Sequence, residues 1–156
     1  MAKKKLLSAA LAFAFFLFCC GCNSAKPTVK EIKSALTDSG AFSAEENLIA
    51  LDTKEIEERF GFSTDILDDF SVLVSKTENE VEQFGVFTLK DNDDLNTVID
   101  AIKQYLKPVT VDDTNKAAVS PHIVLMQTEN SVIFAVTTET ALAAEALASL
   151  GAKEIK

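Results

Sequence analysis

Three cysteines are the residues of this chain whose type and spacing predict the most definite chemistry. Cys19, Cys20 and Cys22 lie close together, and the chain contains no cysteine after Cys22. A domain folded from the downstream residues therefore has no disulfide, no thiol nucleophile and no thiolate metal site. The chemistry of the thiols is confined to the N-terminal segment.

The residues before these cysteines are typical of an export signal. Lys3, Lys4 and Lys5 form a positively charged start, and residues 6–18 follow without a charge. This apolar run is shorter than the roughly 20 residues that a membrane-spanning helix needs, and it has the usual length of a signal core. We therefore predict a signal peptide over residues 1–21.

The end of this segment, Leu-Phe-Cys-Cys-Gly-Cys at residues 17–22, resembles the lipobox of bacterial lipoproteins, in which a small residue precedes the acylated cysteine. Gly21 fits this pattern, so we predict lipidation at Cys22 and a diacylglyceryl membrane anchor, because two acyl chains suffice for stable attachment. Cys19 lies three residues before Cys22, where the lipobox usually has leucine. Cys20, which has Leu17 three residues before it, is therefore the alternative site of lipidation. A soluble secretory signal and a retained N-terminal anchor also fit such a segment, and both make the domain extracytoplasmic as well.

The charge balance of the exported part limits its partners. Removal of residues 1–21 takes away three lysines and leaves 135 residues with 12 basic and 24 acidic side chains, a formal net charge of −12. Such a chain repels nucleic-acid phosphates and anionic lipid, so we expect no nucleic-acid partner and membrane contact through the lipid alone. Its length suffices for one domain, predicted at residues 28–156 after a tether at residues 22–27.

Acidic clusters are the next candidates for chemistry, at residues 91–94 and at Asp65, Asp68 and Asp69. The first cluster lacks the glycine and the distal glutamate of an EF-hand loop, and acids at a helix start are explained by capping and the helix dipole. A glycosidase needs two carboxylates that face a sugar, but among so many acids a suitable pair is no evidence. We expect neither a metal site nor catalytic carboxylates.

The single histidine, His122, precedes an apolar run, and the nearest serine is Ser120. No nucleophile-elbow motif accompanies them, so a hydrolase triad is not predicted. There is no phosphate loop or dinucleotide glycine pattern, and we expect no cofactor. The chain has no Trp and only Tyr105, on the buried edge of its helix, so sugar-stacking platforms are not expected, and the seven phenylalanines after the signal are assigned to the core.

Capping patterns predict the elements that position these residues. Thr28 and Glu31 form a capping box for a helix through Leu36, and Asp52 caps a helix that Gly61 ends. Ser63 caps a short turn over residues 64–69. Strands are predicted at residues 71–76 and 83–90, followed by a helix with apolar residues at one-face spacing that Pro108 closes.

The order then repeats, with strands at residues 122–127 and 131–137, a helix to Leu150, and a short edge strand at residues 153–156. We interpret this as a degenerate internal repeat of a strand-strand-helix unit, because Thr-Glu-Asn occurs in the turn of both units, at residues 77–79 and 128–130. Two such units predict an α+β fold, with one mainly antiparallel sheet, helices packed on one face and short N-terminal helices before it.

These residues resemble a family of small extracytoplasmic lipoproteins of Gram-positive bacteria, mainly Firmicutes, that is described as a domain of unknown function. The resemblance is carried by residues 51–62 (LDTKEIEERFGF), residues 65–70 (DILDDF) and the order of elements from Val29 to Leu150. It implies surface attachment and an α+β domain, and it supplies no catalytic residue.

We therefore expect a membrane-anchored extracytoplasmic lipoprotein with a non-enzymatic binding or accessory domain and a protein partner in the cell envelope. The first alternative is an envelope-acting enzyme that uses carboxylates, which requires Asp or Glu side chains that converge in a cleft. The second is a small solute-binding component of a transporter, for which 135 residues hardly provide two lobes around a ligand.

Overall fold

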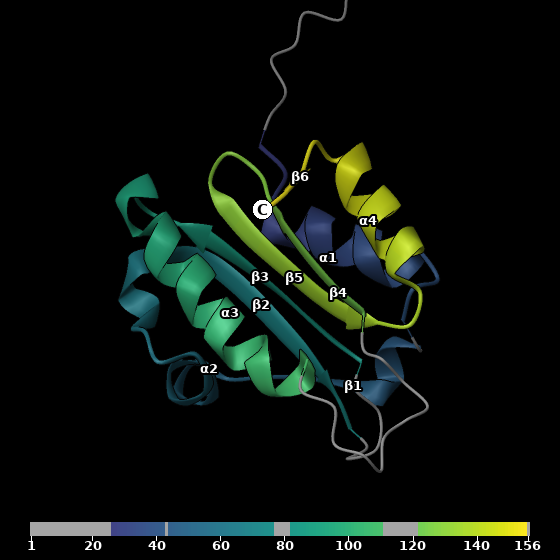
Figure 1. Cartoon of the computed structure of the whole chain (residues 1–156), viewed down its shortest axis with the longest axis horizontal. Helices are drawn as coiled ribbons and strands as arrows, with labels where there is room; N and C mark the ends of the chain where they lie inside the picture. Colours follow the sequence, from purple (N-terminus) through teal and green to yellow (C-terminus); the bar gives the residue numbers. More distant parts are fainter. Residues whose placement is uncertain (1–25, 43, 77–81, 111–121, 156) are drawn as a thin grey trace, which may run out of the picture.

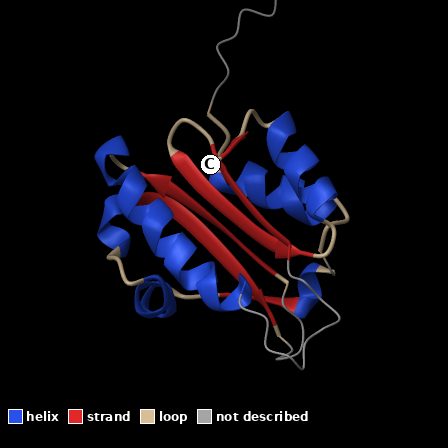
Figure 2. Ribbon diagram, viewed as in Figure 1, coloured by secondary structure: helices blue, strands red, loops and turns tan. Residues whose placement is uncertain are grey.

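The computed structural model of the chain describes residues 26–42, 44–76, 82–110 and 122–155. Within them, six strands form one antiparallel sheet (Figures 1 and 2). The two predicted hairpin strand pairs lie at its centre, with β3 beside β5. The order across the sheet is β1 (Leu48–Ala50), β2 (Leu67–Ser75), β3 (Gln83–Leu89), β5 (Ser131–Thr137), β4 (His122–Gln127) and β6 (Lys153–Glu154).

Four α-helices flank this sheet in the described residues, and the predicted α+β class with an antiparallel sheet is confirmed. They are α1 (Val29–Asp38), α2 (Thr53–Phe60), α3 (Leu95–Thr110) and α4 (Thr140–Ser149). Helices α1 and α4 pack together on one face, and α2 and α3 pack on the other, so the expectation that all helices lie on one face is wrong (Figure 1).

The two-sided arrangement follows from the alternation of side chains along the central strands. In β5, Phe134 contributes to the core under α2 and α3, whereas its neighbours Ile133 and Ala135 contribute to the core under α1 and α4. Every residue of β3 and of β5 is buried. Strands buried on both faces have continuous apolar sequences, and each fully buried large side chain contributes about 1.5–3 kcal/mol.

The interpretation as an internal repeat is not supported by the placement of the helices. Because β3 and β5 are adjacent and antiparallel, a two-fold axis relating the two units would run perpendicular to the sheet and keep both helices on one face. Helix α3, after β3, lies on the opposite face from α4, after β5. The units share an order of elements but not a geometry, and residues 77–79 of the first Thr-Glu-Asn lie outside the described residues.

The predicted helix caps are confirmed in atomic detail. Thr28 and Glu31 form the capping box of α1, and Asp52 and Glu55 form the same arrangement at α2. Gly61 ends α2 with a φ of 74°, a left-handed conformation that favours glycine. Local side-chain chemistry therefore defines both ends of α2.

Several predicted boundaries are wrong. Strand β2 begins at Leu67 rather than at residue 71, and the turn capped by Ser63 ends at Ile66. Asp68 and Asp69 lie at a register shift in the part of β2 that β1 does not pair with, and both side chains are exposed. Two consecutive exposed acidic residues do not follow the strand pattern, so the start of β2 was not predicted. Pro108 does not close α3, which continues to Thr110, since a helix can continue past a proline at the cost of one backbone hydrogen bond and a kink.

The predicted phenylalanine core is confirmed, with Phe70 half-buried and the other six phenylalanines buried. Phe60, at the end of α2, lies with its ring centroid 5.1 Å from that of Phe87 and 4.3 Å from that of Tyr105. The Tyr105 hydroxyl donates a hydrogen bond to Gln83 Oε1 at 2.5 Å. The aromatic cluster therefore joins α2 and α3 to the sheet.

Glu57 on α2 provides a pH-dependent contact with the next turn of the chain. The backbone N–H of Thr64 donates to Glu57 Oε1 at 2.8 Å, and the Thr64 hydroxyl donates to the same atom at 2.9 Å. These two hydrogen bonds, the backbone bond first, hold the pKa of Glu57 below its usual value. Since the folded state has the lower pKa, this stabilisation is present above the unfolded-state pKa and is lost as the pH falls through the folded-state pKa.

We therefore expect Glu57→Gln to lose less unfolding free energy than the wild type when the pH falls from about 6 to about 3. Urea unfolding at a series of pH values measures this difference. Glu58→Gln is the matched control, because Glu58 is exposed on the same helix and, among the described residues, forms an ion pair with Lys54 at 3.6 Å. An unchanged pH slope for Glu57→Gln would show that the Thr64 contact does not stabilise the charged carboxylate in solution.

Candidate functional site

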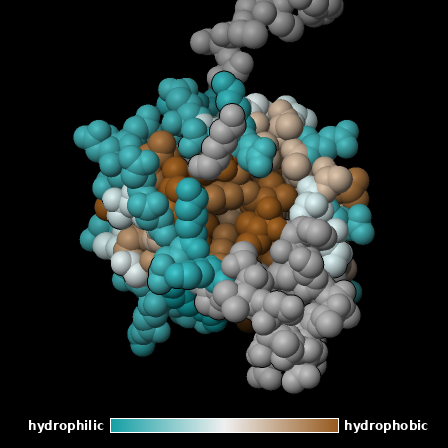
Figure 3. Space-filling view, in the orientation of Figure 1, coloured by the Kyte–Doolittle hydropathy of each residue, from teal (hydrophilic) through white to brown (hydrophobic). Residues whose placement is uncertain are grey.

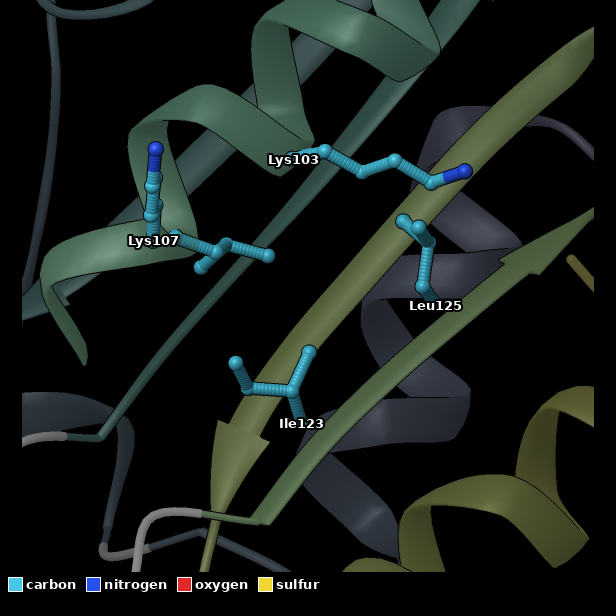
Figure 4. A pocket seen from close by; sticks show the side chains of 5 residues that line it. Lys103, Lys107, Ile123 and Leu125 are labelled. Atoms are coloured by element: carbon cyan, nitrogen blue, oxygen red, sulfur yellow. The ribbon is translucent and has the colours of Figure 1, made fainter. Parts of the chain in front are cut away.

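An apolar hollow lies between α3 and β4, and we refer to it as the α3–β4 hollow. It has a volume of about 220 Å³ and is lined by Lys103, Leu106, Lys107, Ile123 and Leu125 (Figure 4). Leu106 is buried at 3% exposure, whereas Ile123 and Leu125 are half-buried. The volume is below the roughly 300–1,000 Å³ of small-molecule pockets, so the hollow suits a surface contact better than an enclosed ligand.

The hollow exists because α3 covers β5 but leaves β4 only partly covered. Residues 132, 134 and 136 of β5 are fully buried under α2 and α3. Residues 123 and 125, their neighbours on β4, point to the same face and remain half-exposed. On the opposite face β4 packs against α4, where Val124 and Met126 are buried. Strand β4 is therefore apolar on both faces but fully covered on only one.

The space-filling view shows the same feature at larger scale. A continuous hydrophobic area lies at the centre of the face formed by β4 and β5, with hydrophilic residues of α3 along one side (Figure 3). Ile155, which follows β6, is half-buried on this face, and its N–H donates to the carbonyl of Leu125 at 3.0 Å. A continuous exposed apolar area of this kind is typical of a protein interaction site.

Lysines flank this apolar area although the domain as a whole is acidic. Lys103 extends across β5 toward Leu125, whereas Lys107 points away from the hollow (Figure 4). Lys153 of β6 lies on the same face, because it pairs with Gln127 and alternates with Glu154. No described carboxylate lies within ion-pair distance of Lys103 or Lys153, although most described basic residues have a polar partner.

Two of the acidic residues singled out in the sequence have local structural roles. Asp91 accepts a hydrogen bond from the Asp93 N–H at 3.1 Å, and Asp69 accepts one from the Phe70 N–H at 2.8 Å. In the described part of the chain, no group of three or more His, Cys, Asp or Glu side chains is placed to hold a metal ion. None of the described residues that line the α3–β4 hollow is a carboxylate.

None of the other sequence candidates is among the described residues that line this hollow. His122 is the first residue of β4 and pairs in the sheet with Thr137, while Ser120 lies outside the described residues. Cys19, Cys20 and Cys22 also lie outside the described residues, so lipidation at Cys22 stays a prediction. None of the described helices is long and apolar enough to cross a bilayer.

The hollow was not predicted from the sequence, because its two sides come from elements separated by the segment at residues 111–121. One signal was present. Residues 123–126 are continuously apolar (Ile-Val-Leu-Met), which is typical of a strand covered on both faces. In the described structure, α4 covers one face of β4, but α3 covers the other face only partly.

Comparison with known families now identifies the domain. The profile described as "Domain of unknown function (DUF4358)" matches residues 41–137, which is more than half of the chain. The chain belongs to the DUF4358 family. No curated protein and no solved structure matches the chain.

The DUF4358 match defines which part of the fold belongs to the family domain. It begins after α1 and ends with β5, so it contains α2, α3 and the strands β1 to β5 but neither α1 nor α4. The five described residues that line the α3–β4 hollow lie within it. The domain-of-unknown-function resemblance is therefore confirmed over this shorter range, and the hollow is a feature of the family region of this chain.

The sequence motif that carries the resemblance has a structural explanation in this DUF4358 domain. Asp52 caps α2, Ile56 and Phe60 enter the core, Gly61 ends the helix and Phe62 packs against Phe87. The motif thus builds α2 and its junction with β2. It contributes no side chain to the α3–β4 hollow.

Proposed function

We propose that this chain is a membrane-anchored extracytoplasmic lipoprotein whose DUF4358 domain is a non-enzymatic binding or accessory module, with a protein partner docked at the α3–β4 hollow. The observation that carries the proposal is the incompletely covered apolar face of β4, with half-buried Ile123 and Leu125 beside Leu106. Covering such a surface removes apolar area from water at about 25 cal/mol per Å².

The position of the hollow relative to the proposed anchor supports this function. Lys26 pairs with Glu129 in the β4–β5 turn at 3.1 Å, so the chain enters the fold at this end. Four residues from Cys22 to Lys26 span at most about 14 Å. An anchor at Cys22, as in the lipoproteins of Gram-positive cells that the sequence resembles, would keep the turn end close to the membrane.

The hollow lies in the half of the domain away from this turn. Leu89 donates its N–H to the Asn130 carbonyl, so β3 ends at the turn and α3 starts from the same end. Lys107 is therefore toward the far end of α3, and Ile123 is near the far end of β4. The hollow would face laterally or away from the bilayer, where a protein of the cell envelope has access.

The enzyme alternative requires converging carboxylates, and the solute-binding alternative requires an enclosed pocket. The described residues of the α3–β4 hollow supply neither, because they are three aliphatic residues and two lysines around an open volume of about 220 Å³. A flat apolar contact is the chemistry that these side chains support.

Proximity labelling on intact cells tests the proposal. Full chains carrying a labelling enzyme at the C-terminus are compared as wild type, Leu125→Asp and Leu142→Asp. Leu142 is the matched control, since it is 40% exposed and lies on α4, across the sheet from the hollow. We expect the wild type and Leu142→Asp to label the same envelope protein and Leu125→Asp to label it at least about tenfold less. A neighbour labelled equally by all three chains, or no reproducible neighbour, would contradict the proposal.

A further inference from the structure

Among the described residues, no helix lies beside α3 over β4 and β6. Packed helices lie about 8–10 Å apart, and neighbouring strands about 4.8 Å apart, so one helix spacing equals about two strand spacings. Helix α3 packs on β5, and the next two strands in the sheet are β4 and β6. A helix placed beside α3 would therefore lie over β4 and β6, on the side chains of Ile123, Leu125 and Ile155.

The charges on both sides of this strip define the chemistry of such a helix. Lys103 lies on its α3 side, and Lys153 lies on its β6 side. Both side chains are exposed, and neither has an ion-pair partner among the described residues. The strip is therefore locally basic in a domain whose exported part has a formal net charge of −12.

We infer that the α3–β4 hollow binds an amphipathic helix of a partner protein, with one row of apolar side chains flanked by carboxylates. The apolar row covers Ile123 and Leu125, and carboxylates on its two flanks pair with Lys103 and Lys153. Helix-in-groove recognition uses apolar anchors at i, i+3, i+4 and i+7, and complementary charges across an interface add specificity. The inference rests on the proposed function and specifies the partner class for the same surface.

Two other occupants fit the charges less well. A second copy docked face to face would bring the same lysines toward one another and would join two chains that each have a strong negative charge. A bilayer surface would have to reach the half of the domain away from Glu129 and its ion pair with Lys26, the end at which the chain enters the fold. An acidic amphipathic helix satisfies both the apolar strip and the lysines.

A binding assay with two designed peptides tests this inference. The full chain is held in phosphatidylcholine nanodiscs, and fluorescence anisotropy measures two stapled helical peptides of about five turns. Both peptides carry the same leucine row, flanked by glutamates in one and by lysines in the other. The net charge of the domain alone favours the lysine peptide, so a preference for the glutamate peptide reports the local lysines.

We expect the glutamate peptide to bind at least about tenfold more tightly than the lysine peptide, and Lys103→Glu to abolish or reverse that preference. Lys30→Glu is the matched control, because Lys30 is an exposed residue of α1 on the other face and leaves the preference unchanged. Lys103 is exposed, so the variant retains the folded core.

The outcomes separate this inference from the proposed function. If both peptides bind and Leu125→Asp removes both, but the lysine peptide binds more tightly, the surface is correct and the inferred partner chemistry is overturned. If binding of either peptide is insensitive to Leu125→Asp, or if neither peptide binds, the surface itself is wrong. Binding to phosphatidylglycerol vesicles that Lys103→Glu removes, or self-association that Leu125→Asp removes, would overturn the partner helix in favour of a lipid surface or a second copy.

Discussion

Gly85→Ala is expected to destabilise the domain by about 3 kcal/mol, at the upper end of the usual cost of overpacking. Gly85 on β3 pairs with Phe134 on β5, and a Cβ at residue 85 would lie 2.3 Å from Phe134 Cε1. Phe134 is fully buried, so its ring has little space to move. Without this ring the sign would be opposite, because alanine normally stabilises a strand relative to glycine.

A double-mutant cycle isolates this contact from other effects of the substitution. Phe134→Leu alone creates space and lowers stability, but Gly85→Ala in that background is expected to cost much less than in the wild type. Urea unfolding of the four proteins gives the coupling energy. If Gly85→Ala changes the unfolding free energy by less than about 0.5 kcal/mol, or if the two effects simply add, the close approach of the ring to Gly85 is contradicted.

Cys22→Ser is expected to reduce incorporation of labelled palmitate into the chain at least about tenfold, because the hydroxyl of serine does not replace the acylated thiolate. The signal is cut only after acylation in lipoproteins, so the variant is also expected to accumulate as the longer precursor. Cell fractionation alone does not report the loss, since the uncut apolar residues 6–18 can keep the precursor on the membrane. Label and size together measure the modification.

Cys20→Ser is the matched control and retains both label and processing if Cys22 is the lipidated residue. The opposite pattern, in which Cys20→Ser loses the label and Cys22→Ser retains it, would assign the anchor to the alternative cysteine. Label retained in both single variants and in the double variant would contradict lipidation at either position.

Local side-chain chemistry made some parts of the fold predictable from sequence. Asp52 and Glu55 form a capping box through contacts within one turn of helix, and Gly61 ends α2 through its own backbone freedom. Neither depends on residues far away in the chain, so the sequence pattern was sufficient. The strands β4 and β5 were also predicted with the bounds that the structure has.

Features that depend on distant contacts were not predictable in the same way. The exposed Asp68 and Asp69 obscured the start of β2, and β1 has only three residues and is defined by its pairing with β2. The sequence of β5 is continuously apolar, whereas a strand with one exposed face alternates apolar and polar residues. This pattern could have predicted helices on both faces of the sheet. Sequence order alone does not determine the face on which a helix returns.

The candidate site was the least predictable feature. Leu106 was correctly assigned to the buried face of its helix, but its placement beside Ile123 and Leu125 depends on how α3 lies across the sheet. The acidic clusters were weighed as candidate sites and not chosen, but the sequence offered no other surface site in their place, and the hollow is apolar and flanked by lysines. Residues that are unremarkable in sequence became a candidate site only through incomplete coverage of β4.

Site-specific photo-crosslinking in living cells tests the central claim, docking at the α3–β4 hollow, most directly. The full chain carries a photoreactive phenylalanine at residue 123 in one variant and at residue 142, on the opposite face, in the other. We predict one discrete protein adduct from residue 123, none of the same size from residue 142, and loss of the adduct when Lys103→Glu is added. No adduct from residue 123, or the same adduct from both positions, would contradict docking at the α3–β4 hollow.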